Sequence, residues 1–256
     1  MSIVLNEYEW AENAIAERDL GNKPFETLSR IAKYYTYCGC SKREVREKLD
    51  EFLLSVDPNI SLVTWSDTLD SAAKYAAKYS LIMVDSICIT SSEMQRIDAI
   101  DGKQLQRLAF TLLCLAKFFY AVSPKTDYWV STPDNEIMNM ANINTSIKRQ
   151  SAMFNQLHEL GLIRFSKKID NLSVQVLFVE DGEAVMTVDD FRNLGYQYLM
   201  YHGDGYYRCQ NCGLTCKKNN ARNGTGARQK YCHECAVKIR MKQNVESVMR
   251  LRHRIS

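Results

Sequence analysis

The chain has 256 residues, of which 46% are apolar and 25% are charged, and its formal net charge is +3. This is the composition of an ordinary globular protein with one large domain or two to three small ones. Its start is not typical of a signal peptide, and its longest apolar run, around "LAFTLLCLAKFF", is interrupted by Lys117 and is too short to span a bilayer, so we expect a cytoplasmic protein with no membrane partner.

The first part of the chain, residues 1–100, is predicted to be a helical domain. Apolar residues recur at helical spacing in "NEYEWAENAIAERDL", "KPFETLSRIAKYYTY" and "SKREVREKLDEFLLSV", and again from Trp65 to Tyr79. Ser41 and Glu44 have the spacing of a capping box, which marks the start of the third of these helices. Four helices are therefore expected in this domain.

A short apolar run, "LIMVDSICIT", follows the fourth predicted helix. It is either a two-stranded hairpin or one buried strand, and periodicity alone does not separate these alternatives. Thr90 and Glu93 again have the spacing of a capping box, so we expect a further helix start immediately after the run.

The middle of the chain, residues 101–200, is predicted to form a second domain with a linker. An apolar helix from Gln104 to Ala121 is followed by a short helix in "STPDNEIMNMANI" and, after the turn "NINT", by a third helix in "SIKRQSAMFNQLHELGLI". In the third helix Ile147, Phe154 and Leu157 are expected to face inward. The segment "IRFSKKIDNLSVQVLFVEDG" then predicts two strands about a turn.

Three helices followed by a hairpin resemble the winged helix-turn-helix family. In that family the third helix enters the major groove by its first residues, and the hairpin touches the backbone or the minor groove. The resemblance implies that DNA is contacted by Lys148, Arg149, Gln150 and Ser151 on the third helix and by Lys167 and Lys168 at the wing. Arg and Gln can bind guanine and adenine edges, whereas Lys neutralises phosphate. The alternative is a winged helix that binds protein and whose basic residues face solvent.

The end of the chain, residues 201–256, contains two C-x-x-C pairs, Cys209/Cys212 and Cys232/Cys235, with nineteen residues between the pairs. This spacing is typical of zinc sites, and close cysteine pairs in a cytosolic chain favour metal ligation over disulfides. The sequence therefore predicts Zn²⁺ held by these four cysteines, with an iron–sulfur cluster or a redox dithiol as alternatives. Cys216 and His233 are further candidates for contact with the metal.

A cysteine turn, an irregular loop and a helix that carries the last two ligands resemble a treble-clef or zinc-ribbon finger. This part of the chain is strongly basic, with twelve basic and two acidic residues from Tyr206 to Ser256, whereas the rest is net acidic. Such asymmetry favours a nucleic-acid partner, although a solvated basic surface would look the same. The residues expected to contact a phosphate backbone are Lys217, Lys218, Arg222, Arg228 and Lys230 in the loop and Lys238, Arg240 and Lys242 on the helix.

Enzyme motifs are missing from the sequence. It has no phosphate-binding glycine loop, no H-E-x-x-H and no nucleophile elbow, and the segment between Cys212 and Cys232 lacks the histidine that a nuclease of the HNH type needs. The whole chain, with "NINTSIKRQS" and the four-cysteine tail, resembles a group of proteins encoded by bacteriophages and prophages of Gram-positive bacteria, a resemblance that implies no particular activity.

Taken together, these features predict a mainly α (α+β) protein with a helical amino-terminal domain, a central winged helix with a hairpin wing, and a small zinc finger with a long terminal helix. We expect a non-enzymatic, zinc-containing protein that binds duplex DNA in the cytoplasm of a bacterial host and acts in replication or transcription control. The alternative is a phage inhibitor or adaptor that binds a host protein or a nucleoprotein defence complex, as in an anti-CRISPR role.

Overall fold

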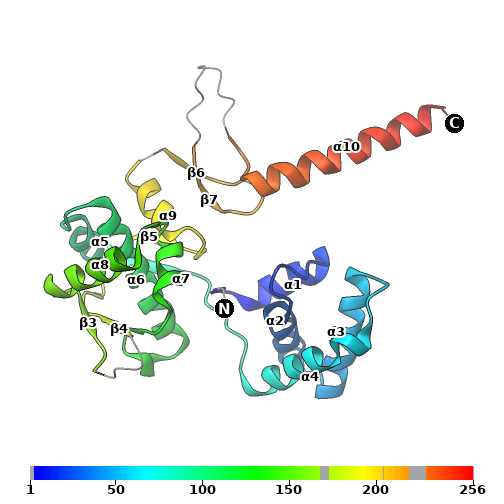
Figure 1. Cartoon of the computed structure of the whole chain (residues 1–256), viewed down its shortest axis with the longest axis horizontal. Helices are drawn as coiled ribbons and strands as arrows, with labels where there is room; N and C mark the ends of the chain where they lie inside the picture. The colour runs from blue at the N-terminus through cyan, green and yellow to red at the C-terminus, as the bar shows by residue number, and fades with distance from the viewer. Residues whose placement is uncertain (1–2, 168–172, 204, 219–228, 256) are drawn as a thin grey trace. The chain divides into compact units, whose positions relative to one another are not determined.

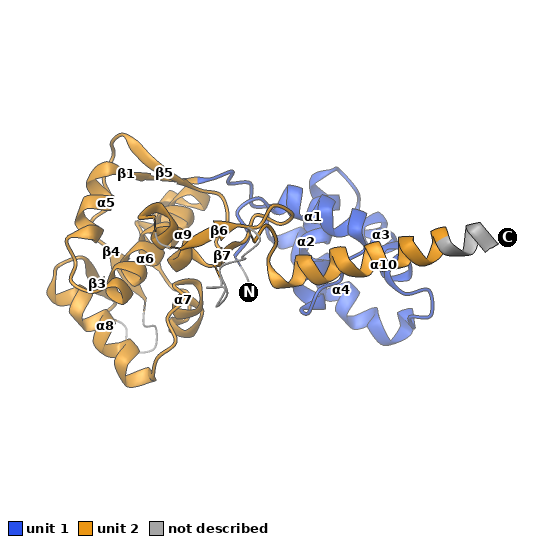
Figure 2. Ribbon diagram, turned by 90° about the horizontal axis from the view of Figure 1, so that it is seen from above, with its two compact units in different colours: residues 1–86 blue, residues 87–256 orange. Residues whose placement is uncertain are grey.

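The computed structural model describes residues 3–167, 173–203, 205–218 and 229–255, with side chains placed up to residue 250 (Figure 1). The chain divides into two compact units, residues 1–86 and 87–256 (Figure 2). Helices dominate both units, and the strands of the described residues form three small sheets. This confirms the expected mainly α (α+β) class.

Unit 1 is built from four helices, as predicted. They are α1 (Glu7–Glu17), α2 (Pro24–Tyr37), α3 (Lys42–Val56) and α4 (Leu62–Lys78). α2 packs against each of the other three, and α4 also packs against α3. Fully buried side chains recur at helical spacing on the inward faces, as do Leu28 and Ile31 in α2 and Leu49 and Leu53 in α3. The capping box of Ser41 and Glu44 forms at the start of α3, as its spacing predicted.

Unit 2 is built around α6, a long apolar helix. Its elements are β1 (Ile87–Thr90), α5 (Ser91–Asp98), α6 (Lys103–Val122), the 3-10 turn η1 (Pro124–Thr126), β2 (Trp129–Val130), α7 (Asp134–Met140), α8 (Ile147–Glu159), β3 (Ile163–Phe165), β4 (Val174–Val176), β5 (Ala184–Val188), α9 (Leu194–Tyr201), β6 (Tyr206–Arg208), β7 (Thr215–Lys217) and α10 (His233–Ile255). By length and composition alone α6 could cross a membrane, so the expectation that this apolar run is too short to span a bilayer was wrong. Most of its apolar stretch is buried inside unit 2, however. Its composition is therefore that of a core helix.

The apolar run after α4 forms one strand and not a hairpin. β1 pairs antiparallel with β5, so that Ile87 lies opposite Val188. β5 was not predicted from the sequence, because most of its side chains are exposed and it lacks an apolar face that would mark a strand. This pairing places β1 in unit 2, and the capping box of Thr90 and Glu93 begins α5 directly after it.

The three predicted helices of the middle segment are α6, α7 and α8, and the two predicted strands after them are β3 and β4. An additional strand, β2, pairs with β4 and gives the sheet order β2-β4-β3. Phe154 and Leu157 of α8 are buried as expected, but Ile147 is 80% exposed, so its predicted inward direction was wrong. The reason is that α8 buries only its later part, from Met153 onward, whereas Ile147 is the first residue of the helix.

Helix α9, in a stretch expected to include a linker, packs closely against the turn between α7 and α8. A Cβ added to Gly195 would lie 1.9 Å from the carbonyl oxygen of Ala141. Beside this contact, the Asn142 side chain accepts a hydrogen bond from the backbone N–H of Tyr196 (3.0 Å) and donates one to Oδ1 of Asn193 (2.9 Å). The approach of the two backbones therefore requires glycine at position 195.

Replacing Gly195 by alanine should lower the free energy of unfolding of unit 2. In an open helix this change stabilises a protein by about 1 kcal/mol. Here we expect the opposite sign and a loss of about 1–3 kcal/mol, because the new methyl group meets backbone atoms that move only with α7. Urea unfolding would measure the effect, with Gly205→Ala as control, since no atom lies within 4 Å of that added Cβ. Equal stability of both variants would contradict the prediction.

Candidate metal centre and basic surface

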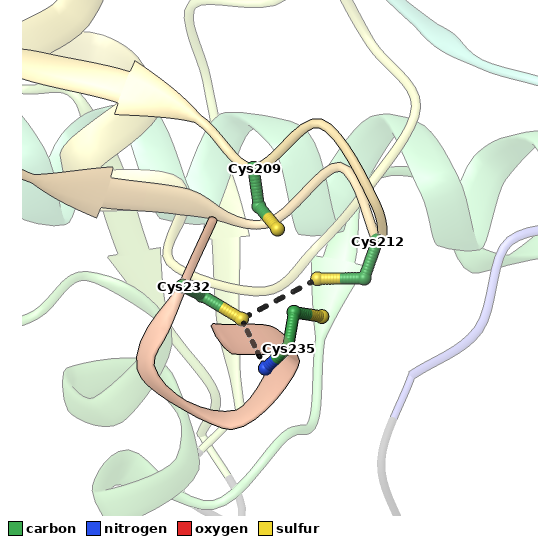
Figure 3. A group of neighbouring side chains, drawn as sticks. All are labelled: Cys209, Cys212, Cys232 and Cys235. Atoms are coloured by element: carbon green, nitrogen blue, oxygen red, sulfur yellow. Dashed lines mark hydrogen bonds between the residues drawn. The ribbon is translucent and has the colours of Figure 1, made fainter. Parts of the chain in front are cut away.

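The first cysteine pair lies in the turn of a hairpin made by β6 and β7. The backbone N–H of Cys209 donates to the carbonyl of Leu214, and the N–H of Gly213 donates to the carbonyl of Cys209, both at 2.9 Å. Gly213 has a φ of +72°, a conformation that glycine adopts without steric cost. The turn thereby directs the thiols of Cys209 and Cys212 to one side of the hairpin (Figure 3).

The second pair lies at the start of α10. Cys232 immediately precedes the helix and Cys235 is in its first turn, where the N–H of Cys235 lies 3.4 Å from Sγ of Cys232. The positive end of the helix dipole favours negative charge at this position. The beginning of α10 therefore supplies two sulfur atoms. The positive end of its dipole partly compensates negative charge on them.

The four sulfur atoms form one cluster. They all lie within 4.8 Å of one another, and Sγ of Cys212 and Sγ of Cys232 are 3.7 Å apart. Four thiolates at about 2.3 Å from a tetrahedral metal would be separated by about 3.8 Å. All four cysteines are free thiols, and three of them are buried. The predicted ligand set is thus brought together in a geometry that can hold a metal ion.

Burial and hydrogen bonding act in opposite directions on the thiols. Burial raises the pKa of Cys235 to about 12. Burial also opposes ionisation of Cys209, but hydrogen bonds from the backbone at Cys232, Cys212 and Asn211 outweigh it and lower its pKa to about 6. Four adjacent thiolates repel one another, so a bound cation is needed to ionise the whole set, and metal binding would release protons.

The two further candidates lie outside this set. Cys216 packs against the cluster, but its thiol is directed to the carbonyl oxygen of Leu214 at 3.6 Å. His233 is exposed at the start of α10. Neither belongs to the group of four sulfur atoms that the described residues bring together.

We call the β6–β7 hairpin and the start of α10, which together carry the four cysteines, the finger. Its hairpin is attached to the rest of unit 2 by polar contacts that the sequence did not predict. The Arg192 guanidinium donates to the carbonyl of Cys212 (2.6 Å), and the Asn193 amide donates to the carbonyl of Thr215 (2.9 Å). Arg208 forms an ion pair with Asp189 at 2.6 Å. No motif marks these residues, because each contact joins two segments that only the fold brings together.

The residues predicted to contact nucleic acid at the start of α8 are largely exposed. Lys148, Arg149 and Ser151 face solvent, whereas Gln150 is half-buried and its amide donates to the carbonyl of Thr145 at 3.0 Å. Ser146 caps the helix by accepting a hydrogen bond from the backbone N–H of Arg149. The first turn of α8 therefore presents two cations beside the positive end of its helix dipole.

The other residues predicted to contact nucleic acid lie on the finger, except for the two wing residues after β3. Those that the structure describes are all exposed: Lys167, Lys217, Lys218, Lys230, Lys238, Arg240 and Lys242. Lys168, Arg222 and Arg228 lie outside the described residues. Within the described part of the chain, neither these cations nor Lys148 and Arg149 form an ion pair with an acidic side chain.

No protein-family model, curated protein or solved structure matches the chain. The features that bear on function are therefore the cluster of four thiols and the exposed cations that have no acidic partner among the described residues.

Proposed function

We propose that the protein is a non-enzymatic, zinc-containing DNA-binding protein, in which the finger grips the phosphate backbone and α8 adds register or specificity. The observation that carries this proposal is the set of exposed cations on the finger and at the start of α8, which have no acidic partner among the described residues. Cations that an internal carboxylate does not neutralise are free to replace the counterions of a polyanion.

Zinc is the metal that this ligand set favours. Four cysteine sulfurs at tetrahedral spacing suit zinc or an iron–sulfur cluster, and neither Ca²⁺ nor Mg²⁺ selects thiolate ligands. A single ion fits sulfur atoms that all lie within 4.8 Å of one another. When bound, the ion would act as a structural cross-link between the β6–β7 turn and α10.

The winged helix is supported by topology. The order α6, β2, α7, α8, β3, β4, with β4 between β2 and β3, puts three helices before a hairpin that a third short strand completes. On this interpretation Lys148 and Arg149 are placed to approach the major groove. We further propose that the protein acts in the cytoplasm of a bacterial host, in replication or transcription control of a phage or prophage.

The proposal predicts salt-dependent binding of the zinc-loaded protein to duplex DNA of random sequence. If the finger and α8 together make 6 to 10 phosphate contacts, affinity should fall by about 10³-fold or more between roughly 50 and 200 mM salt. Fluorescence anisotropy at both salt concentrations would measure this. Absence of binding at both concentrations would overturn the proposal.

A charge reversal tests the part played by α8. Lys148→Glu with Arg149→Glu should weaken DNA binding and reduce its dependence on salt, because two phosphate-facing cations become anions. The matched control is Lys42→Glu with Arg43→Glu, an adjacent Lys–Arg pair in the first turn of α3 in unit 1. If the α8 variant binds DNA as tightly as the α3 control, α8 does not contact DNA, and the winged helix would instead be a protein-interaction module.

The alternative role as an inhibitor or adaptor depended on the acidic amino-terminal helices. Unit 1 contains fourteen acidic and ten basic residues. Several of these acids already have a basic partner inside the unit: Glu7 pairs with Lys33, Asp70 with Arg46, and Glu51 with Lys48. Carboxylates with internal partners are poor imitations of a phosphate backbone, so we place DNA binding first.

A further inference from the structure

Helix α10 is much longer than the metal centre requires. It has 23 residues, of which the first turn carries the cysteine ligand Cys235. Residues 240–250 are exposed on every side of the helix. Helices in proteins owe most of their stability to the packing of an apolar face. The described part of α10 beyond the finger has exposed apolar side chains and no partner among the described residues of unit 2.

Three of the five large apolar side chains that are exposed on the described part of α10 lie on one stripe, whereas Val245 lies beside it and Met249 lies off it. Val237, Met241 and Val248 are 37%, 63% and 48% exposed, and Asn244 lies between the last two. The sequence continues the same spacing with Leu251 and Ile255. From Val237 to Ile255 the steps along the chain alternate between four residues and three, which is the a/d pattern of a coiled coil.

We propose that α10 is a dimerisation helix that pairs with α10 of a second copy in a parallel, two-stranded coiled coil. A stripe of this kind is complementary to itself, because the a and d residues of one copy pack into the holes between the same residues of the other. Dimerisation is independent of DNA binding, and the inference therefore goes beyond the proposed function.

Asn244 determines the direction of pairing. A polar side chain in an apolar seam needs a hydrogen-bond partner, because an unsatisfied buried amide is costly. In a parallel, in-register pair each Asn244 faces the Asn244 of the other copy, and the two amides can bond to each other. In the antiparallel alignment with the greatest overlap, Asn244 would instead face Val248, which offers no hydrogen-bonding group.

The charges beside the stripe are compatible with the parallel pair. In that arrangement a residue at position g of one helix faces position e of the next heptad in the other helix. This places Arg240 opposite Val245, so its long aliphatic stem can cover an apolar side chain and no like charges meet. Lys242 lies away from the seam and keeps its cation in solvent. A dimer would therefore present two copies of the basic finger surface.

Sedimentation equilibrium of the full-length, zinc-loaded protein across the micromolar range tests the inference. We expect a mass twice that of the monomer, and we expect Met241→Glu with Val248→Glu to abolish the dimer. The matched control is Met249→Glu, an equally apolar residue that is 57% exposed on the same helix but lies off the stripe. A monomeric wild-type protein, or equal loss of the dimer in the control, would overturn the proposal.

The parallel direction of the two paired α10 helices is tested by cross-linking. Asn244→Cys should give a disulfide-linked dimer under mild oxidation, because the two cysteines face each other in the parallel pair. Met249→Cys and the wild-type protein, which has its own free thiols, show the background. A dimer by mass in which Asn244→Cys cross-links no faster than Met249→Cys would reject the parallel register.

Discussion

Replacing Cys232 and Cys235 by serine is expected to abolish metal binding and to unfold the finger while leaving unit 1 and the α6 core folded. The buried core of the finger consists of cysteines, with Cys212, Leu214 and Cys216 packed against it. So small a core cannot offset the conformational entropy of its backbone. Binding of a structural zinc ion supplies about 10–16 kcal/mol in small fingers, so its loss removes the main source of stability.

Metal content and limited proteolysis would measure the two effects. The double variant should contain no stoichiometric zinc, and protease should cut it first in the segment after residue 205. Cys216→Ser is the matched control, because Cys216 lies beside the cluster but outside the set of four sulfur atoms. Unchanged zinc content in the double variant, or equal loss of zinc in the control, would refute the ligand assignment.

The substitution Glu93→Ala is expected to destabilise unit 2 by about 3–5 kcal/mol, because it leaves the half-buried Lys117 cation and two backbone N–H groups without their acceptor. Glu93 is fully buried, and both of its carboxylate oxygens accept hydrogen bonds from Nζ of Lys117 at 2.8 Å. The carboxylate also accepts from the backbone N–H groups of Thr90 (2.8 Å) and Glu180 (3.0 Å). One side chain thus joins the start of α5, the core helix α6 and the segment before β5.

Urea unfolding followed by circular dichroism would measure this loss. The control is Arg96→Ala, which breaks an ion pair with Glu180 in the same region, because Arg96 and Glu180 are 51% and 36% exposed. Exposed pairs contribute about 0–1 kcal/mol, so this variant should remain close to the wild type. A Glu93 variant as stable as the Arg96 variant would show that the buried ion pair does not hold unit 2 together.

The contacts around the finger also explain how the two candidate surfaces could be linked. Asn193 donates to the carbonyl of Thr215 in β7 and accepts from Asn142, which lies in the turn before α8. Asn142 and Asn193 both have left-handed backbone conformations, which asparagine tolerates better than most residues. The β6–β7 hairpin, which carries Cys209 and Cys212, and the turn that leads into α8 are therefore joined by two consecutive side-chain hydrogen bonds.

The sequence by itself determined the features that depend on local spacing. Helical periodicity located the four helices of unit 1 and the three helices before the hairpin, because an amphipathic face is a property of consecutive residues. The two C-x-x-C pairs likewise identified the four thiols that form one cluster, since a tight turn and a first helical turn each direct two thiols to one point. The capping boxes predicted at Ser41 and Thr90 are confirmed, because they too depend only on residues three positions apart.

Only the tertiary structure decided the features that join distant segments. β1 pairs with β5, Glu93 meets Lys117 and the N–H of Glu180, and Gly195 approaches Ala141 so closely that no Cβ fits between them. Ile147 is exposed because α8 extends beyond the core that its later residues enter. None of these follows from periodicity, because a contact between residues far apart along the chain exists only after the backbone has folded and the entropy of closing the loop between them has been lost.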